Sequence, residues 1–416
     1  MTSVTEDPTV ERREDPFGEV LPEPDRRPRR YTVISVDDHV VEPPGMFEGR
    51  LPGRFADRSP RVVRGDDAKE AWLFEDQLLP NIGFNATVGR RPGAGSREPI
   101  NFADMRRSAW DIEARVADMD LDGVYASLCF PSYLAGFGGL RLQTLSADLD
   151  FSLALVRAWN DWYIEEWCGP HPDRMIPCQL TWLHDPELAA SEIRKNAERG
   201  FKAVTFPESP HQAGLPSLHS GYWDPFVRAC AETGTAICVH TGSSGKLPET
   251  AEDAPGDVTS ALFGAGYSLT TTVDWLYSRY PVKFPNVKIV ISEGGIGWVP
   301  ALLDRLDHHY RKNGDKRGIW VDTALHPAEL LQRNFFFCLL DEPSAMVQRH
   351  RIGIDNIVFE TDFPHTDASW PDTQELLHRH LTGLPEDEAR KISWQNAAAL
   401  FRHPIPDAVQ LDPSAF

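Results

Sequence analysis

Eight short apolar runs, rich in β-branched residues, recur along the chain and alternate with helical patterns. The runs occupy residues 31–36, 124–130, 175–180, 201–206, 235–240, 287–292, 334–340 and 355–361. Most are continuously apolar, which is typical of strands buried on both faces of a parallel sheet. Eight such strands separated by helices predict an α/β fold, a closed (β/α)8 TIM barrel. A doubly wound open sheet is the alternative, but no GxGxxG motif follows the first strand to support a dinucleotide site.

Helical patterns with apolar residues at three-to-four spacing lie between these runs. They cover residues 111–120, 185–199, 224–233, 298–312 and 386–402. The first two begin with Asp, a residue type that starts helices because its carboxylate accepts hydrogen bonds from the first free backbone N–H groups.

The barrel domain is expected over residues 31–403. Residues 1–30 are charged and interrupted by prolines, with almost no periodic apolar content, so we expect a flexible or disordered N-terminal arm. Residues 404–416 are expected to form a C-terminal tail. Residues 48–110 are far longer than an ordinary βα connection. An insertion after the first strand would lie on the C-terminal face of the barrel, where it could cap a site.

The composition limits the possible partners. The 416 residues carry a formal net charge of −20, which argues against nucleic acid or an anionic membrane surface as partner. There is no run of eighteen apolar residues and no signal-peptide pattern. The six cysteines contain no CxxC pair, so we expect buried reduced thiols in a cytoplasmic protein. A small-molecule substrate is the expected partner.

Titratable side chains stand where four of the predicted strands end. The first strand ends with Asp37 and His39, and the fifth ends with His240 before a Gly/Ser-rich turn. Glu293 follows the sixth strand before paired glycines, and Asp362 follows the eighth. The βα loops of a parallel barrel converge at these strand ends, so the side chains should meet at one rim. Burying such groups together is costly unless a cation neutralises them.

The first strand end contains a D-x-H pair. Residues two apart in an extended strand point the same way, so Asp37 and His39 should face the barrel mouth while Asp38 points away. With His240 and Asp362 they make a set of two imidazoles and two carboxylates. This donor set suits one divalent ion, Zn²⁺ first, with Mn²⁺ or Fe²⁺ also possible.

The D-x-H pair, His240 before its Gly/Ser turn, "SEGGIGW" and "ETDFPH" fall in order on the predicted strands. Together they resemble the amidohydrolase superfamily, and most closely its amidohydrolase-related group, which includes aminocarboxymuconate semialdehyde decarboxylase. The resemblance runs from about residue 31 to residue 403. It implies metal-ligand roles for Asp37, His39, His240 and Asp362, and it implies a homodimer or higher homo-oligomer.

Two positions depart from the pattern of that group. Its decarboxylases usually carry a histidine after strand six, where this chain has Glu293. Binuclear members of the superfamily use a carboxylated lysine at the end of strand four, whereas Lys202 stands near the start of that strand. We therefore expect one metal ion and not two.

The candidate catalytic residues are Glu293, Asp362 and His365. Glu293 either orients His240 or a bound water, or acts as the general acid or base. His365 either polarises the substrate or holds the turn in "DFPH". Glu42 is expected to organise a loop, and Glu208, at the end of the fourth strand, could face the pocket.

The sequence thus favours a mononuclear metal-dependent hydrolase, in which metal-activated water attacks an amide, ester or carbon–carbon bond of a small aromatic or carboxylated substrate. The replacement of the usual histidine by Glu293 is the reason for preferring hydrolysis. The alternative is a non-oxidative decarboxylase, a carboxy-lyase of an aromatic or muconate-like acid. A second alternative is a barrel that binds a ligand without turnover.

Overall fold

The computed structural model describes residues 20–91, 98–246, 250–313, 320 and 323–416. Its main sheet contains eight parallel strands in the order β5-β1-β11-β10-β9-β8-β7-β6. A parallel bridge between Ser127 and Met175 brings the two ends of this sheet together, so the barrel is nearly closed. Each predicted run supplies one strand, and the predicted (β/α)8 barrel is confirmed. The strands are β1 Ile34–Val40, β5 Ala126–Pro131, β6 Cys178–Leu180, β7 Ala203–Thr205, β8 Ala236–His240, β9 Ile289–Ser292, β10 Phe335–Leu339 and β11 Ile357–Phe359.

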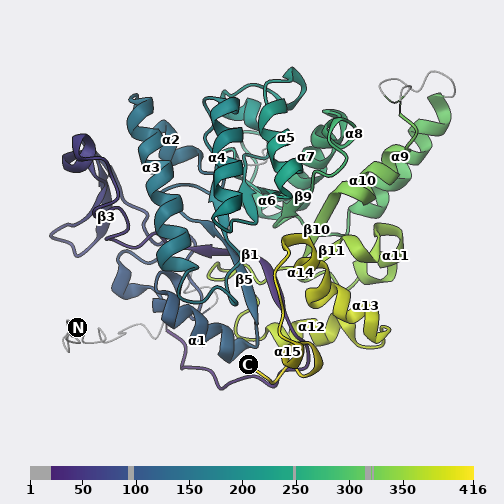
Figure 1. Ribbon diagram of the computed structural model, residues 1–416. Coiled ribbons are helices and arrows are strands. Elements are labelled where there is room, and N and C mark those ends of the chain that lie inside the picture. The colour runs from purple at the N-terminus through teal and green to yellow at the C-terminus, as the bar shows by residue number, and fades with distance from the viewer. Residues whose placement is uncertain (1–19, 92–97, 247–249, 314–319, 321–322) are drawn as a thin grey trace.

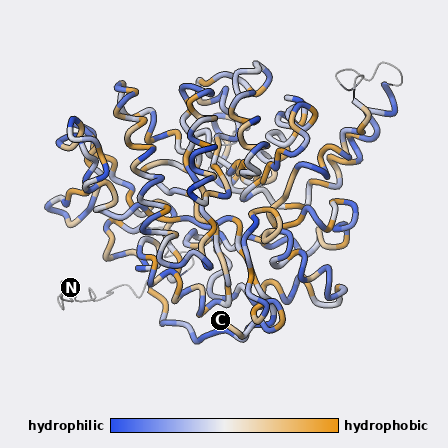
Figure 2. Tube along the Cα trace, in the orientation of Figure 1, coloured by the Kyte–Doolittle hydropathy of each residue, from blue (hydrophilic) through white to orange (hydrophobic). Residues whose placement is uncertain are grey.

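Helices surround the barrel (Figure 1). Their bounds are α1 Ile112–Asp122, α2 Leu140–Thr144, α3 Leu149–Trp162, α4 Pro186–Glu198, α5 Asp224–Thr233, α6 Asp257–Leu262, α7 Ala265–Tyr277, α8 Tyr280–Lys283, α9 Val299–Asn313, α10 Pro327–Asn334, α11 Arg349–Ile352, α12 Thr373–Leu381, α13 Glu386–Arg390, α14 Asn396–Phe401 and α15 Asp407–Leu411. Hydrophilic and hydrophobic residues alternate along the outer helices (Figure 2). None of the described helices is long and apolar enough to cross a membrane.

All five predicted helical segments form helices. Asp111 caps α1 by accepting a hydrogen bond from the backbone of Ala114, and Asp185 caps α4 in the same way. The segment 386–402 is interrupted by a π-helical turn between α13 and α14. The long helix α3 was not anticipated from the sequence.

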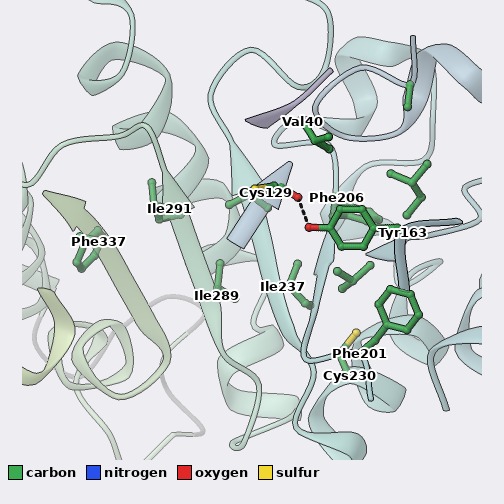
Figure 3. Close-up of a cluster of buried hydrophobic side chains, with 14 of the residues drawn as sticks. Val40, Cys129, Tyr163, Phe201, Phe206, Cys230, Ile237, Ile289, Ile291 and Phe337 are labelled. Atoms are coloured by element: carbon green, nitrogen blue, oxygen red, sulfur yellow. Dashed lines mark hydrogen bonds between the residues drawn. The ribbon is translucent and has the colours of Figure 1, made fainter. Parts of the chain in front are cut away.

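The core has two layers because successive strand residues point to opposite faces. One layer lies between strands and helices and includes Ile237, Ile289 and Phe337 (Figure 3). There the Tyr163 hydroxyl donates a hydrogen bond to the backbone carbonyl of Cys129 at 2.7 Å. The other layer fills the barrel itself, with residues such as Val290. All six cysteines are buried and free, in line with the prediction of reduced thiols.

The insertion after β1 builds a small antiparallel sheet, with β2 Arg61–Arg64, β3 Glu70–Phe74 and β4 Gln77–Leu79. This sheet stands to one side of the barrel, where Phe74 packs against Phe151 of α3 (Figure 1). The chain then returns to the carboxyl ends of the strands. There Thr87 and Thr366 share a hydroxyl hydrogen bond of 2.8 Å, and the backbone N–H of Val88 donates to the carbonyl of Pro364.

The N-terminal arm passes below the barrel, where it meets the C-terminus. Residues 1–19 of the expected arm lie outside the described residues, but residues 20–30 contact the domain. The guanidinium of Arg29 lies 3.7 Å from the ring centre of Phe416, and the backbone N–H of Arg30 donates to Gln374. The expected tail contains α15, whose Val409 is buried against the amino-terminal ends of the strands. This end of the barrel is opposite the one that carries the titratable residues.

We expect Asp185→Ala to lower the free energy of unfolding by about 1 kcal/mol, because the first N–H groups of α4 lose their acceptor. Urea denaturation measures this change. Glu198→Ala is the matched control, because it removes an exposed carboxylate from the opposite end of the same helix, where the helix dipole gives a negative charge no advantage. Equal destabilisation by both substitutions would contradict the capping role.

Candidate metal centre

Four side chains from three strands converge at the carboxyl end of the barrel. Asp37 and His39 belong to the end of β1, His240 is the last residue of β8, and Asp362 follows β11. The Nε2 atoms of His39 and His240 are 3.1 Å apart. Asp37 Oδ1 lies 3.6 Å from each of these nitrogens, and Asp362 Oδ1 lies 3.4 Å from His39 Nε2. The structure therefore brings together the four residues that the sequence picks out as metal ligands.

These separations fit one metal ion. Ligand atoms bound at 2.0–2.2 Å with tetrahedral to octahedral angles are separated from one another by about 3.0–3.6 Å. The separations among Asp37, His39 and His240, from 3.1 to 3.6 Å, fall within that span. The ligand atoms of Asp362 group with those of His39 and His365 instead.

The imidazoles of His39 and His240 direct their Nε2 atoms toward the centre of the cluster. His240 Nδ1 lies 2.7 Å from the carbonyl oxygen of Thr241, and His39 Nδ1 lies 3.4 Å from that of Pro131. A carbonyl only accepts, so each Nδ1 carries the proton and each Nε2 keeps a lone pair. Two facing lone pairs repel each other unless a cation lies between them. This arrangement is the one that metal-binding histidines adopt.

The carboxylates accept no well-aligned hydrogen bond from the described residues, although His365 Nδ1 lies close to Asp362 Oδ1. Neither oxygen of Asp37 or of Asp362 has a hydrogen-bond partner among the described residues, although both side chains are fully buried. Burial and the nearby carboxylates, including Glu293 and Glu360, raise the pKa of both aspartates well above the usual range. Burial also lowers the pKa of His240 to about 3. A divalent ion would offset this crowding of negative groups while leaving the imidazole neutral.

Glu293 borders the same cluster. Its Oε2 lies 3.5 Å from His240 Nε2, and its backbone N–H donates to the carboxylate of Glu360 at 3.0 Å. Both Glu293 and Asp362 adopt left-handed backbone conformations, with φ of 52° and 55°. Such conformations cost energy for residues other than glycine and concentrate at functional sites. The 3.5 Å distance between Glu293 Oε2 and His240 Nε2 is compatible with either predicted role of Glu293.

Sequence reasoning missed Glu360. This side chain is buried, and burial raises its pKa to about 8. The available signal was its spacing, because Glu360 and Asp362 are two apart at the end of one strand.

His365 completes the wall beside Asp362. Its Nδ1 lies 2.8 Å from Asp362 Oδ1, and its ring stacks on that of His39 with centroids 3.8 Å apart. Burial lowers the pKa of His365 to about 4. A neutral His365 can hold or pass a proton at Asp362.

Asp38 points away from the cluster, in line with the sequence analysis. Its carboxylate accepts hydrogen bonds from the hydroxyl groups of Ser35, Ser127 and Thr361 and from the backbone N–H of Phe363. These contacts join β1, β5 and the loop after β11, so they fix the relative positions of the strand ends.

Glu42 organises the loop after β5, where it accepts hydrogen bonds from the backbone N–H groups of Leu134 and Ala135. Lys202 precedes β7 and therefore lies at the amino-terminal end of the barrel, away from the cluster. Four ligand positions with no lysine among them are compatible with a single ion.

A family model describing amidohydrolases matches residues 10–403, nearly the whole chain. The chain belongs to the amidohydrolase family. A curated relative, the gamma-resorcylate decarboxylase of Rhodococcus jostii (strain RHA1), is 24% identical over 276 residues, covering 60% of this chain and 77% of that protein. The family assignment agrees with the resemblance seen in the sequence.

Solved structures of family members share the fold. An amidohydrolase from Mycobacterium avium subsp. paratuberculosis K-10 aligns with a TM-score of 0.70 and 24% identity, covering 89% of this chain and 99% of that one. A 5-carboxyvanillate decarboxylase from Novosphingobium aromaticivorans DSM 12444, in complex with manganese and a nitrobenzoic acid, aligns with a TM-score of 0.60 and 19% identity, covering 90% and 96% of the two chains.

Without metal, the stability of the protein should fall as the pH rises above 6.5, where the buried histidines are neutral in both the folded and the unfolded state. Burial raises the pKa of Glu360 from 4.5 to about 8 and that of Glu208 to about 7. These two carboxyl groups therefore bind protons more tightly in the folded state, and the stability that they contribute is lost between pH 6.5 and about pH 8.

Thermal unfolding with a chelator, followed across this pH window, measures the effect. Saturation with Mn²⁺ should weaken the dependence, because the ion would stabilise the ionised carboxylate of Asp37. A melting temperature that rises with pH in the presence of the chelator would contradict the raised pKa values of Glu360 and Glu208.

Proposed function

We propose that this protein is a metal-dependent enzyme that removes CO₂ from a hydroxylated aromatic acid without oxidation. The observation that carries this proposal is the buried cluster of two imidazoles and two carboxylates, which is in contact with phenyl rings. The decarboxylase relatives support it over the hydrolase that Glu293 favours in the sequence.

The surroundings of the cluster also favour loss of CO₂ over attack by water. The ring of Phe130 lies 5.9 Å from that of His39 and 5.0 Å from that of His240. The ring of Phe137 lies 4.6 and 4.4 Å from the same two imidazoles. An apolar, water-poor wall favours decarboxylation because the negative charge of the carboxylate disappears in CO₂. The same wall suits an aromatic ring.

Asp37, His39, His240 and Asp362 would hold the ion, with the donor set of a mononuclear site. When bound, a divalent ion supplies positive charge that holds and orients the substrate carboxylate. Manganese is the first ion to test, since the 5-carboxyvanillate decarboxylase holds it, and Zn²⁺ suits the same donors.

Asp362 is the best-placed acid. Its Oδ1 lies 2.8 Å from His365 Nδ1, so His365 can return a proton to it after each turnover. Asp362 donates this proton to the ring carbon that carries the carboxylate, and a pair of ring electrons forms the new C–H bond. The C–C bond to the carboxylate then breaks, its electron pair restores the aromatic ring, and CO₂ leaves. Glu293, held by Glu360, orients the substrate beside His240.

The Mn²⁺-loaded protein should release CO₂ from at least one member of a panel of 2-hydroxybenzoates, including 2,6-dihydroxybenzoate and 5-carboxyvanillate. In D₂O, the product should carry deuterium at the carbon that lost CO₂. Asp362→Asn should lower the rate by about 10²–10⁴-fold, the usual contribution of a general acid. Glu293→Gln should retain measurable release.

Hydrolysis of esters, lactones or amides by the same preparation, with no CO₂ from any acid, would instead support the hydrolase. A metal-loaded protein that binds these acids without turnover would support the non-catalytic alternative.

Metal analysis of the purified protein should give about one divalent ion per chain, because the ligand atoms of Asp37, His39 and His240 lie close enough together to share one ion. His240→Ala should lower the bound metal and the melting temperature together, since it leaves buried carboxylates without a cation. The control is His308→Ala on an exposed face of α9. Two ions per chain, or full metal content in His240→Ala, would refute the mononuclear assignment.

A further inference from the structure

Phe137 covers the metal centre from the loop after β5. Its ring centroid lies 4.6 Å from that of His39, 4.4 Å from that of His240 and 5.6 Å from that of His365. These are packing distances for aromatic rings. One phenyl ring therefore rests on three imidazoles of the site at once.

The backbone around Phe137 is held across the barrel mouth. The hydroxyl of Thr205, at the end of β7, donates a 2.5 Å hydrogen bond to the carbonyl of Phe137. Gly138 passes so close to the loops after β7 and β8 that a Cβ there would lie 3.2 Å from Pro207 N and from the Cβ and carbonyl oxygen of Ser243. Only glycine allows this approach without displacing the neighbouring backbone.

The covered centre is closed to ligands. Asp37, His39 and His240 have no exposed surface. Phe84 of the insertion lies outside Phe137, with ring centroids 6.3 Å apart, and keeps 37% of its surface exposed. A substrate carboxylate can reach the ligand atoms from the mouth only if the ring of Phe137 moves aside.

Glu208 lies beside this loop. The hydroxyl of Ser243 donates a 2.5 Å hydrogen bond to Glu208 Oε2 and accepts one from the Glu208 backbone N–H at 3.0 Å. Glu208 Oε1 has no hydrogen-bond partner among the described residues, although only 1% of the residue is exposed. An unpaired buried carboxylate oxygen is costly and calls for a polar partner. Gly138 packs on the two residues that flank and bind this carboxylate, Pro207 and Ser243.

We propose that Phe137 occupies the place of the substrate's aromatic ring, and that Glu208 recognises a hydroxyl group on that ring once residues 136–139 have moved aside. The inference rests on the proposed function for the identity of the substrate as an aromatic acid. Beyond the proposed function, the inference assigns one subsite to the aromatic ring of the substrate and a second, polar subsite that selects hydroxylated rings. Neither residue belongs to the ligand cluster.

Binding of nitrobenzene and of the three nitrophenol isomers to the full-length, Mn²⁺-loaded protein tests both subsites by calorimetry. The nitro group stands in for a carboxylate but cannot leave as CO₂, so binding is read without turnover. At a pH just above 7, where Glu208 is ionised and 3-nitrophenol is still neutral, 3-nitrophenol should bind about tenfold more tightly than nitrobenzene, as expected for a hydrogen bond to a charged acceptor.

Glu208→Gln should reduce this preference to within about twofold, because a neutral amide is a weaker acceptor than a carboxylate. Glu42→Gln is the matched control, because both oxygens of Glu42 already accept backbone hydrogen bonds. It should keep the preference for nitrophenol. An unchanged preference in Glu208→Gln overturns the assignment of the polar subsite.

Phe137→Ala should tighten the binding of all four probes by a similar factor, since no ring then has to be displaced. Gly138→Ala should do the same without altering Phe137, because the added methyl group displaces the closed loop. Weaker binding of nitrobenzene to both variants would overturn the ring subsite, because Phe137 would then be a fixed wall.

The two proposals fail separately. Absence of CO₂ release with the binding pattern intact would refute the decarboxylase alone. An active decarboxylase that lacks the binding pattern would refute this inference alone.

Discussion

The structure depends on the electrostatic cost of placing several titratable groups in one dry space. Asp37, Asp362 and Glu360 are fully buried, with Glu293 almost so, and burial together with mutual repulsion raises the pKa of each carboxyl. The imidazoles beside them are driven to their neutral forms by the same burial. A divalent cation would balance such a cluster. The ligand atoms of Asp37, His39 and His240 lie close enough together to bind such a cation.

A second set of contacts keeps the cluster in register. Asp38 joins three parts of the barrel through its hydrogen bonds, and Arg115 donates a 2.5 Å hydrogen bond to the carbonyl of His39. The ligand cluster thus lies on one side of β1, and a polar network lies on the other. Because β1 pairs with β11, which Asp362 follows, a shift of β1 would move Asp37 and His39 relative to Asp362.

The mouth of the barrel adds an apolar constraint. Phe130 approaches the imidazoles from within the barrel, and Phe137 covers them from the loop above. These two rings give the cluster an apolar wall, which suits the aromatic ring proposed for the substrate. The long insertion contributes Phe84 at the outer edge, while its small sheet packs on α3, away from the mouth.

The sequence by itself determined the eight strands, the family and the four titratable residues that meet at one rim. This was possible because buried parallel strands are continuously apolar, and because a titratable residue at a strand end has one rim on which to lie. Only the tertiary structure decided the place of Glu360, the separations within the cluster and the covering of the site by Phe137. These features depend on contacts between β7, β8, β9 and the loops after β5 and β11. Such contacts join residues that are far apart in the chain, so local sequence patterns do not predict the distances between these residues.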